Sequence, residues 1–243
     1  MISSIITLSK SAFLRFFLLG LALALTQEPF NIPYLTFLVL PSVSFLVVRS
    51  LKTLKQYLLG GFVFGVGYFG LTFLWIINPF LVDYPKNIWL APFAYIAFVS
   101  SLSFFWAIAF YLSKYLMRDE EENRKKIFCL SIIFAIAELF RCYLFSGFPW
   151  GILSYAWIDT PVSVFVTWFG PYIFNSIIII VGFNLFYSSL PNDIFKVIFL
   201  ITALLGLQNK YLENDFDEIS ERLTIRLVQP NIKQKDKWKK DNE

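Results

Sequence analysis

Long apolar runs alternate with short polar segments over the first 208 residues of the chain. An α-helix rises about 1.5 Å per residue, so about 20 apolar residues cross the hydrocarbon core of a bilayer. The pattern therefore predicts about seven transmembrane helices, at Ser11–Thr26, Pro33–Val48, Tyr57–Ile77, Ile88–Leu116, Ile127–Phe145, Val162–Tyr187 and Ile194–Leu207. We predict that residues 1–208 form the helical bundle of an all-α polytopic membrane protein.

The pattern changes after the last of these runs. Residues 209–221 are polar and acidic, which is typical of a linker. From Leu223 to Val228 apolar and polar residues alternate, a period of two that predicts a β-strand, and Pro230 ends it. A single strand is not stable by itself. We therefore expect residues 222–243 to be the first part of a further, incomplete α/β domain.

Glycine and proline mark two of the apolar runs. The third run is dense in glycine, and Gly61 and Gly65 are four residues apart, so they share one helix face and allow close backbone approach. We interpret them as packing positions. The sixth run contains Gly170 followed by Pro171, which predicts a bend there.

Composition supports a membrane protein. Hydrophobic residues make up 57% of the chain and charged residues only 16%, whereas soluble domains carry about 25% charged residues. The net charge of +4 does not indicate a nucleic-acid partner, because the cations lie between apolar runs. Without histidine, Cys129 and Cys142 cannot form a usual zinc site, and the commonest general base is missing. We predict neither a metal nor a cofactor.

The distribution of Lys and Arg predicts the orientation, because cytoplasmic loops of membrane proteins are enriched in these residues. With the N-terminus in the cytoplasm, the loops on the opposite side of the seven helices hold only Lys86. The tail after Leu207 would then lie outside the cytoplasm. The cytoplasmic segments would hold Lys10, Arg15, Arg49, Lys52, Lys55, Lys114, Arg118, Arg124, Lys125, Lys126 and Lys196.

Two charged residues lie inside the fifth apolar run. Glu138 and Arg141 are three residues apart and share a helix face. Burying one ionised group alone is costly, and pairing reduces that cost. Two interpretations follow. Arg141 reaches the outer interface and binds a lipid phosphate, for which its guanidinium fork is suited, or the pair is structural and locks this helix to its neighbours.

The segment Ser146-Gly147-Phe148-Pro149-Trp150 breaks the chain after the fifth run. Gly147 and Pro149 are typical of a turn. Phe148 and Trp150 lie at the predicted outer boundary of the membrane, where Trp commonly serves as an interfacial anchor.

Two separated motifs resemble one family. Glu138-x-x-Arg141, then Ser146 to Trp150 and Tyr155, is similar to the membrane half of apolipoprotein N-acyltransferases. Leu227-Val228-Gln229-Pro230-Asn231-Ile232, followed by Lys237-Trp238, resembles the opening of the periplasmic nitrilase-like domain of the same family. The glycine-rich third run also fits. The resemblance covers nearly the whole chain in the right order.

The resemblance implies an activity on the outer face of the bacterial inner membrane. Members of the family move an acyl chain from a phospholipid to the N-terminal diacylglyceryl-cysteine of a lipoprotein, through a cysteine thioester. A Glu acts as the base and a Lys stabilises the oxyanion. The implied partners are a phospholipid acyl donor, a diacylglyceryl apolipoprotein acceptor and membrane lipids. Trp238 matches a family Trp near the thioester, where it either helps to hold substrate or is a partly buried aromatic residue. Under this resemblance, the alternative to interfacial anchoring is that Phe148 and Trp150 line the entrance for the acyl chain. The candidate substrate-binding residues are Glu138, Arg141, Phe148, Trp150 and Trp238.

The catalytic residues of the family follow its Lys-Trp element, and none of them lies between Trp238 and Glu243. Cys129 and Cys142 precede the loop and match no catalytic position. We therefore expect no catalytic residue in this sequence and no acyl transfer by it alone, whether it is a fragment, half of a split gene or a decayed copy. The alternative from another class is a non-catalytic integral membrane protein that binds lipid or scaffolds a partner.

Overall fold

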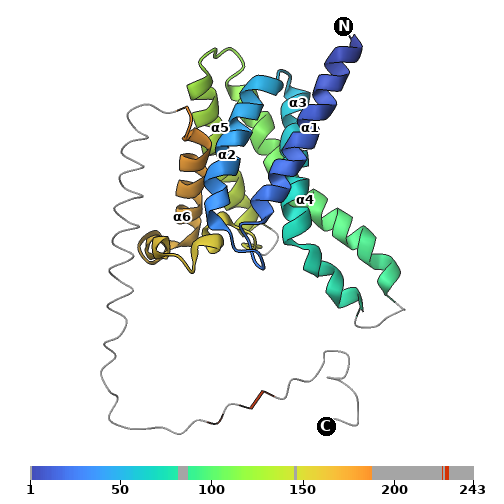
Figure 1. The fold of residues 1–243 in the computed structure, drawn as a ribbon, viewed down its shortest axis with the longest axis vertical. Helices are drawn as coiled ribbons and strands as arrows, with labels where there is room; N and C mark the ends of the chain where they lie inside the picture. The colour runs from blue at the N-terminus through green and yellow to red at the C-terminus, as the bar shows by residue number, and fades with distance from the viewer. Residues whose placement is uncertain (1, 82–86, 145–146, 188–225, 227, 230–243) are drawn as a thin grey trace.

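Six α-helices dominate the part of the chain that the computed structural model describes, which is residues 2–81, 87–144, 147–187, 226, 228 and 229 (Figure 1). Short 3₁₀ helices connect them, at Pro33–Leu35, Leu74–Leu81, Ile88–Leu90, Leu153–Trp157 and Pro161–Ser163. The α-helices are α1 (Ile2–Ala24), α2 (Thr36–Ser50), α3 (Leu54–Thr72), α4 (Ala91–Leu116), α5 (Asn123–Tyr143) and α6 (Val164–Asn184).

The helices pack in a ring whose order differs from the chain order. Helix α1 contacts α2 and α3, and the contacts continue from α3 to α4, α5 and α6. Helix α6 then packs on α2 and closes the ring. The two connections at the ends of α5 leave the bundle at opposite ends, as Figure 1 shows. The ring therefore has two faces, one at the α4–α5 turn and one at the α5–α6 loop.

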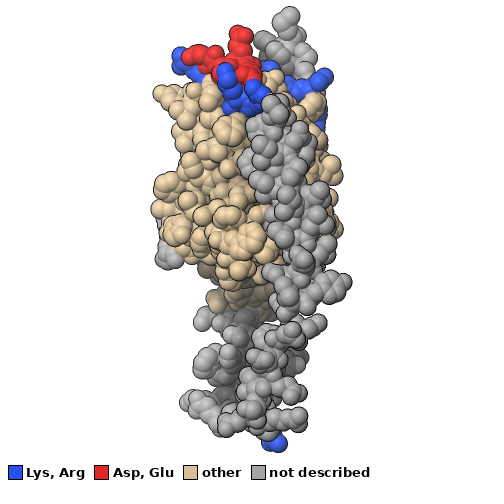
Figure 2. Space-filling view, turned by 90° about the vertical axis from the view of Figure 1, so that its left-hand side faces the viewer, with Lys and Arg blue, Asp and Glu red and all other residues tan. Residues whose placement is uncertain are grey.

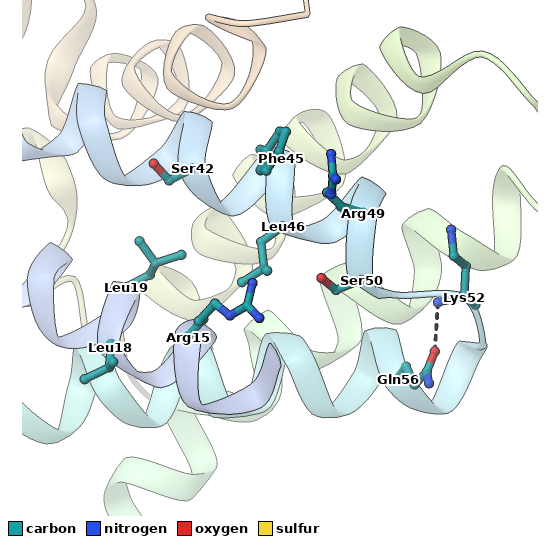
Figure 3. Close-up of a pocket in the computed structure, with 10 residues that line it drawn as sticks. All are labelled: Arg15, Leu18, Leu19, Ser42, Phe45, Leu46, Arg49, Ser50, Lys52 and Gln56. Carbon is teal, nitrogen blue, oxygen red and sulfur yellow. Dashed lines mark hydrogen bonds between the residues drawn. The ribbon is translucent and has the colours of Figure 1, made fainter. Parts of the chain in front are cut away.

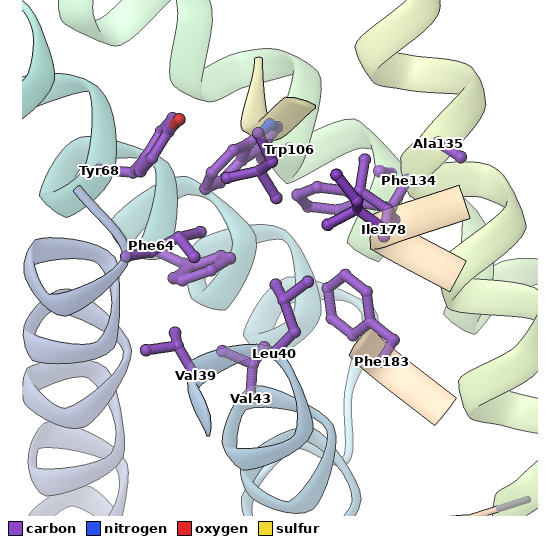
Figure 4. Close-up of a cluster of buried hydrophobic side chains, with 14 of the residues drawn as sticks. Val39, Leu40, Val43, Phe64, Tyr68, Trp106, Phe134, Ala135, Ile178 and Phe183 are labelled. Carbon is purple, nitrogen blue, oxygen red and sulfur yellow. The ribbon is translucent and has the colours of Figure 1, made fainter. Parts of the chain in front are cut away.

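Aromatic side chains fill the middle of the ring (Figure 4). Trp106 of α4 lies at the centre, with its ring stacked on Tyr68 at 5.0 Å and tilted against Phe64 at 4.8 Å. Phe134 of α5 continues the cluster from Trp106 to Phe183 of α6. All five rings are buried. Aromatic pairs at these distances each add to the stability gained by burial, so this cluster fixes α3, α4, α5 and α6 relative to one another.

Local signals explain several helix boundaries. Thr53 begins α3 with a capping box, in which its hydroxyl accepts the Gln56 N–H and the Gln56 side chain accepts the Thr53 N–H. Gly170 breaks α6 with a φ of 74°, directly before Pro171. The bend predicted at these two residues is confirmed.

The glycines of α3 bring its backbone against α4. A Cβ on Gly61 would lie 2.5 Å from the carbonyl oxygen of Trp106, and one on Gly65 would lie 2.9 Å from the Cα of Ser103. Gly67 makes an equally close approach to α1, where Gly20 faces it. The packing interpretation of Gly61 and Gly65 is confirmed, since no side chain fits at either position.

Replacing Gly65 by Ala is expected to destabilise the bundle by about 1–3 kcal/mol, because the added methyl group overpacks the α3–α4 contact. Gly70→Ala is the matched control on the same helix, since a Cβ there meets no atom closer than 3.5 Å. Chemical unfolding of both variants in detergent micelles measures the difference. Equal stability of the two variants would show that the α3–α4 contact tolerates the methyl group.

A described α-helix overlaps each of the first six predicted spans. Three described segments are long and apolar enough to cross a membrane, Pro33–Ser50, Ile88–Leu116 and Val164–Asn184. A fourth follows if α3 and Leu74–Leu81, bent by 49°, form one span. The apolar part of α1 is shorter, and α5 carries several charges. The chain is a membrane protein rich in apolar helices, and the count of seven spans stays a prediction.

The remaining predictions for the C-terminal part fall largely outside the described residues. These are the seventh span at Ile194–Leu207, the linker at 209–221 and the domain start at 222–243. Of the predicted strand, only Arg226 and Val228 are described, and neither has regular secondary structure. Among the described residues there is no β-strand.

Charged side chains gather at one end of the bundle, at the turn between α4 and α5 (Figure 2). Arg118 and Arg124 each pair with a neighbouring carboxylate there. The N–H of Glu122 and the ammonium of Lys125 hold the pKa of Glu120 below its usual range. Several charged side chains of this turn therefore pair with one another.

Candidate functional site

The loop between α5 and α6 lies at the end of the bundle opposite the charged turn (Figure 1). Gly147 and Gly151 both have positive φ, of 81° and 69°. At Gly151 a Cβ would also lie 2.8 Å from the Cζ atom of Phe73. Glycine at residue 151 therefore allows both the turn and the close packing of the loop on the end of α3.

Glu138 and Arg141 form a buried ion pair on α5. Arg141 Nε donates to Glu138 Oε1 and Nη2 donates to Oε2, both at 2.8 Å. The Trp106 indole N–H also donates to Glu138 Oε1, at 2.7 Å. Both charged side chains are almost fully buried. Two parallel hydrogen bonds are the strongest arrangement for such a pair, and the bond from Trp106 ties this pair on α5 to α4.

The same guanidinium holds the loop. Arg141 Nη1 donates to the carbonyl oxygen of Phe148 at 3.1 Å and to that of Trp150 at 3.0 Å. Its charge lies 5.2 Å from the centre of the Phe69 ring, a distance at which cation–π attraction contributes. Arg141 is therefore buried and engaged with protein groups. This geometry favours the structural interpretation of the ion pair, and binding of substrate by Glu138 or Arg141 stays a prediction.

Three further side chains hold consecutive backbone groups of the loop. Tyr68 Oη of α3 donates to the carbonyl oxygen of Gly151 at 2.7 Å. Gln27 Nε2, after α1, donates to Ile152 O at 3.4 Å. The N–H of Leu153 donates to Asn175 Oδ1 of α6 at 2.8 Å. We call the four side chains that hold the loop the loop clamp, and they are Gln27, Tyr68, Arg141 and Asn175.

Two aromatic side chains of the clamped loop, Phe148 and Trp150, join a cluster of aromatic side chains from other elements. Phe148 packs edge-on against Phe98 and Phe73, with ring centres 5.2 and 5.5 Å apart. Trp150 lies 5.1 Å from Trp75, which follows α3. Trp75 and Trp150 are 44% and 51% exposed. We call this cluster the aromatic ledge, and its members are Phe73, Trp75, Phe98, Phe148 and Trp150.

The structure thus brings four of the five candidate residues together, Glu138, Arg141, Phe148 and Trp150, while Trp238 lies outside the described residues. Sequence reasoning missed the other three members of the clamp. Gln27 and Asn175 carry a signal that could have found them, because each is a polar residue at or within an apolar run. Tyr68 does not stand out in a chain with 12 Tyr and 29 Phe.

The exposed part of the ledge consists of the largely apolar rings of Trp75 and Trp150. The clamp side chains bind backbone groups of the loop that carries Trp150, and an exposed aromatic surface of this kind is suited to contact lipid. No group of three or more His, Cys, Asp or Glu side chains that could hold a metal ion occurs among residues 2–81, 87–144 and 147–187.

Comparison with known proteins decides the family. A family model described as the apolipoprotein N-acyltransferase N-terminal domain matches residues 19–184, which contain all six elements of the ring except the first part of α1. The chain belongs to the apolipoprotein N-acyltransferase family. The family suggested by the Glu-x-x-Arg and Ser-Gly-Phe-Pro-Trp motifs is confirmed.

Curated relatives agree with this assignment. The apolipoprotein N-acyltransferase of Brucella suis is 29% identical over 241 residues, covering 91% of this chain and 44% of the relative. That of Sinorhizobium fredii is 32% identical over 159 residues, covering 61% of this chain and 29% of the relative. The match to the Brucella suis apolipoprotein N-acyltransferase shows that this chain spans less than half the length of such a relative.

Proposed function

We propose that residues 1–208 are the membrane half of an apolipoprotein N-acyltransferase of the bacterial inner membrane. The observation that carries this proposal is the loop clamp, which holds the α5–α6 loop by five hydrogen bonds involving four side chains. Two of these bonds reach Phe148 and Trp150 of the Ser-Gly-Phe-Pro-Trp motif, and three reach residues 151–153 directly after it. Such an arrangement fixes the loop at one face of the bundle. A site that must present lipid to a catalytic domain above it requires a fixed floor of this kind.

The charge difference between the two ends of the bundle supports the proposed orientation. The end with the α4–α5 turn carries many of the Lys and Arg residues, and cytoplasmic segments are rich in these residues. We place this end, with the N-terminus, in the cytoplasm. The aromatic ledge then lies at the periplasmic interface, where Trp is favoured. The C-terminal tail, with Trp238, would lie on the same periplasmic side.

The ledge would contact the acyl chains of the substrates. These are a phospholipid acyl donor and a diacylglyceryl apolipoprotein acceptor. Phe148 and Trp150 would line the path of an acyl chain, and Glu138 and Arg141 would act through the loop by positioning these rings. Trp238 would add a contact from the tail. These roles need no metal and no cofactor.

The chemistry would take place in a nitrilase-like domain, which residues 222–243 would begin. By resemblance to the family, a cysteine thiolate attacks the ester carbonyl of the phospholipid and expels the lysophospholipid. The α-amine of the lipoprotein then attacks the thioester and releases the thiolate, while a Glu accepts the proton and a Lys stabilises the oxyanion. We expect that residues 1–243 do not supply this set and do not transfer acyl chains alone.

A complementation experiment tests the proposal. In a bacterium depleted of its own apolipoprotein N-acyltransferase, residues 1–221 joined to the C-terminal part of the Brucella suis relative should restore growth and N-acylated lipoprotein, detected by mass spectrometry. The same chimera with its nucleophilic cysteine changed to alanine should not, and neither should residues 1–243 alone. Rescue by residues 1–243 alone would refute the proposed division of labour. A folded chimera without activity would instead favour a non-catalytic protein that binds lipid or scaffolds a partner.

A further inference from the structure

A groove of about 980 Å³ opens between α1 and α2, near the start of α3. Figure 3 shows Arg15 extending from α1 toward Leu46 and Ser50 of α2. The groove lies away from the α5–α6 loop, toward the end of the bundle where α2 ends and α3 begins. Its lining residues are Arg15, Leu18, Leu19, Ser42, Phe45, Leu46, Arg49, Ser50, Lys52 and Gln56.

Three cations from separate parts of the chain meet at this groove. Arg15 lies on α1, Arg49 on the last turn of α2 and Lys52 in the turn before α3. All three side chains are exposed. Within the described residues none of them forms an ion pair, whereas Arg118, Arg124, Lys125 and Arg141 each do. The groove therefore concentrates positive charge that the described protein does not neutralise.

The rest of the lining is largely apolar, with Leu18 and Leu19 from α1 and Phe45 and Leu46 from α2. Figure 3 shows Leu46 extending from α2 toward Arg15 on α1. The guanidinium of Arg49 lies over the Phe45 ring, 5.6 Å from its centre, so it lies beside the apolar lining and does not extend straight into solvent. A cationic rim above an apolar channel matches the two parts of a phospholipid, a phosphate headgroup and an acyl chain.

We propose that this groove binds one acidic phospholipid, with its phosphodiester on Arg15, Arg49 and Lys52 and an acyl chain along Leu18, Leu19, Phe45 and Leu46. Guanidinium groups bind phosphate oxygens in a bidentate manner, and basic pockets between transmembrane helices at the cytoplasmic side bind anionic headgroups. Three cations exceed the single charge of one phosphodiester, which favours a headgroup with net negative charge over a zwitterionic one.

This lipid is distinct from the acyl donor. The aromatic ledge lies at the loop end of the bundle, and the groove lies toward the other end. Binding of this lipid does not depend on the proposed orientation of the bundle. Its assignment to the cytoplasmic leaflet does rest on that orientation. There it would join α1 to α2, which are connected by a long turn at the opposite end of the bundle.

Native mass spectrometry of the full chain in a neutral detergent tests the proposal. Phosphatidylglycerol and phosphatidylethanolamine with identical acyl chains are added in turn, and bound lipids are counted. The variant is Arg15→Gln with Arg49→Gln. Its matched control is Arg118→Gln with Arg124→Gln, which removes the same charge from exposed cations that already pair with carboxylates.

The wild-type chain and the control should bind one phosphatidylglycerol in preference to phosphatidylethanolamine. The groove variant should bind it about tenfold to thirtyfold more weakly, since each cation near an anionic headgroup contributes roughly fivefold. An equal loss in the control would mean that only total charge matters and would overturn the proposal, as would a wild-type chain without preference. Acyl transfer is not measured, so failure here leaves the proposed function untouched.

Discussion

Replacing Arg141 by Met is expected to destabilise the bundle by about 3–5 kcal/mol, because it leaves the buried Glu138 carboxylate without its counter-charge. The carbonyl oxygens of Phe148 and Trp150 also lose their donor. Both effects act at the same place, so the α5–α6 loop should detach from the bundle before the helices separate. Chemical unfolding in detergent, followed by protease cleavage within the loop, measures the two effects.

Two further variants test whether this loss of stability is specific to the ion pair. Arg118→Met removes an arginine whose side chain is 69% exposed, and it should change the free energy of unfolding by no more than about 0.5 kcal/mol. The double variant Glu138→Gln with Arg141→Met removes the stranded charge and should be more stable than Arg141→Met alone. If Arg141→Met were as stable as Arg118→Met, the ion pair would not hold the loop.

The sequence predicted the helices well in segments that are apolar over the length of a membrane span. The runs from Pro33 to Leu116 became α2, α3 and α4 because membrane-length apolar segments have no other way to satisfy their backbone. The bend at Gly170 was predictable for a similar reason, since Pro171 removes a backbone donor. The ring order was not predictable, because it depends on which helix faces fit one another. Gly20 against Gly67 is one such fit, and neither glycine alone indicates its partner.

The candidate site was only partly predictable from the sequence, because part of it also depends on how the helices and the loop pack together. Glu138 and Arg141 stand out because charge is rare inside an apolar run, so their pairing could be inferred from their spacing. Whether the arginine binds lipid or the protein itself depends on the loop carbonyl groups in front of it, and a backbone group has no signature in sequence. The clamp residues Tyr68 and Asn175 belong to different helices, so only the tertiary packing brings them to the loop.

The loop clamp positions Trp150 within the aromatic ledge. A variant of Trp150 can distinguish its two interpretations, as an interfacial anchor or as part of the path of an acyl chain. Interfacial anchoring requires only a Trp at the right depth, and the apolar contact of an acyl chain requires a Trp at this particular place. Trp168 on α6 offers the comparison, since it is 57% exposed and lies outside the ledge. It packs on Phe165 and Phe169 of its own helix.

Trp150→Ala is expected to lower acyl transfer by the chimera with the Brucella suis relative about tenfold to hundredfold. Contact of one large aromatic side chain with an acyl chain contributes about 1.5–3 kcal/mol. Folding should change little, because the ring is 51% exposed and the clamp binds the backbone of the loop, not this side chain. Initial rates of lipoprotein N-acylation in vesicles measure the effect, with Trp168→Ala as the control. A loss of similar size in both variants would assign Trp150 to anchoring, whereas a loss confined to Trp150→Ala would assign it to the path of the acyl chain.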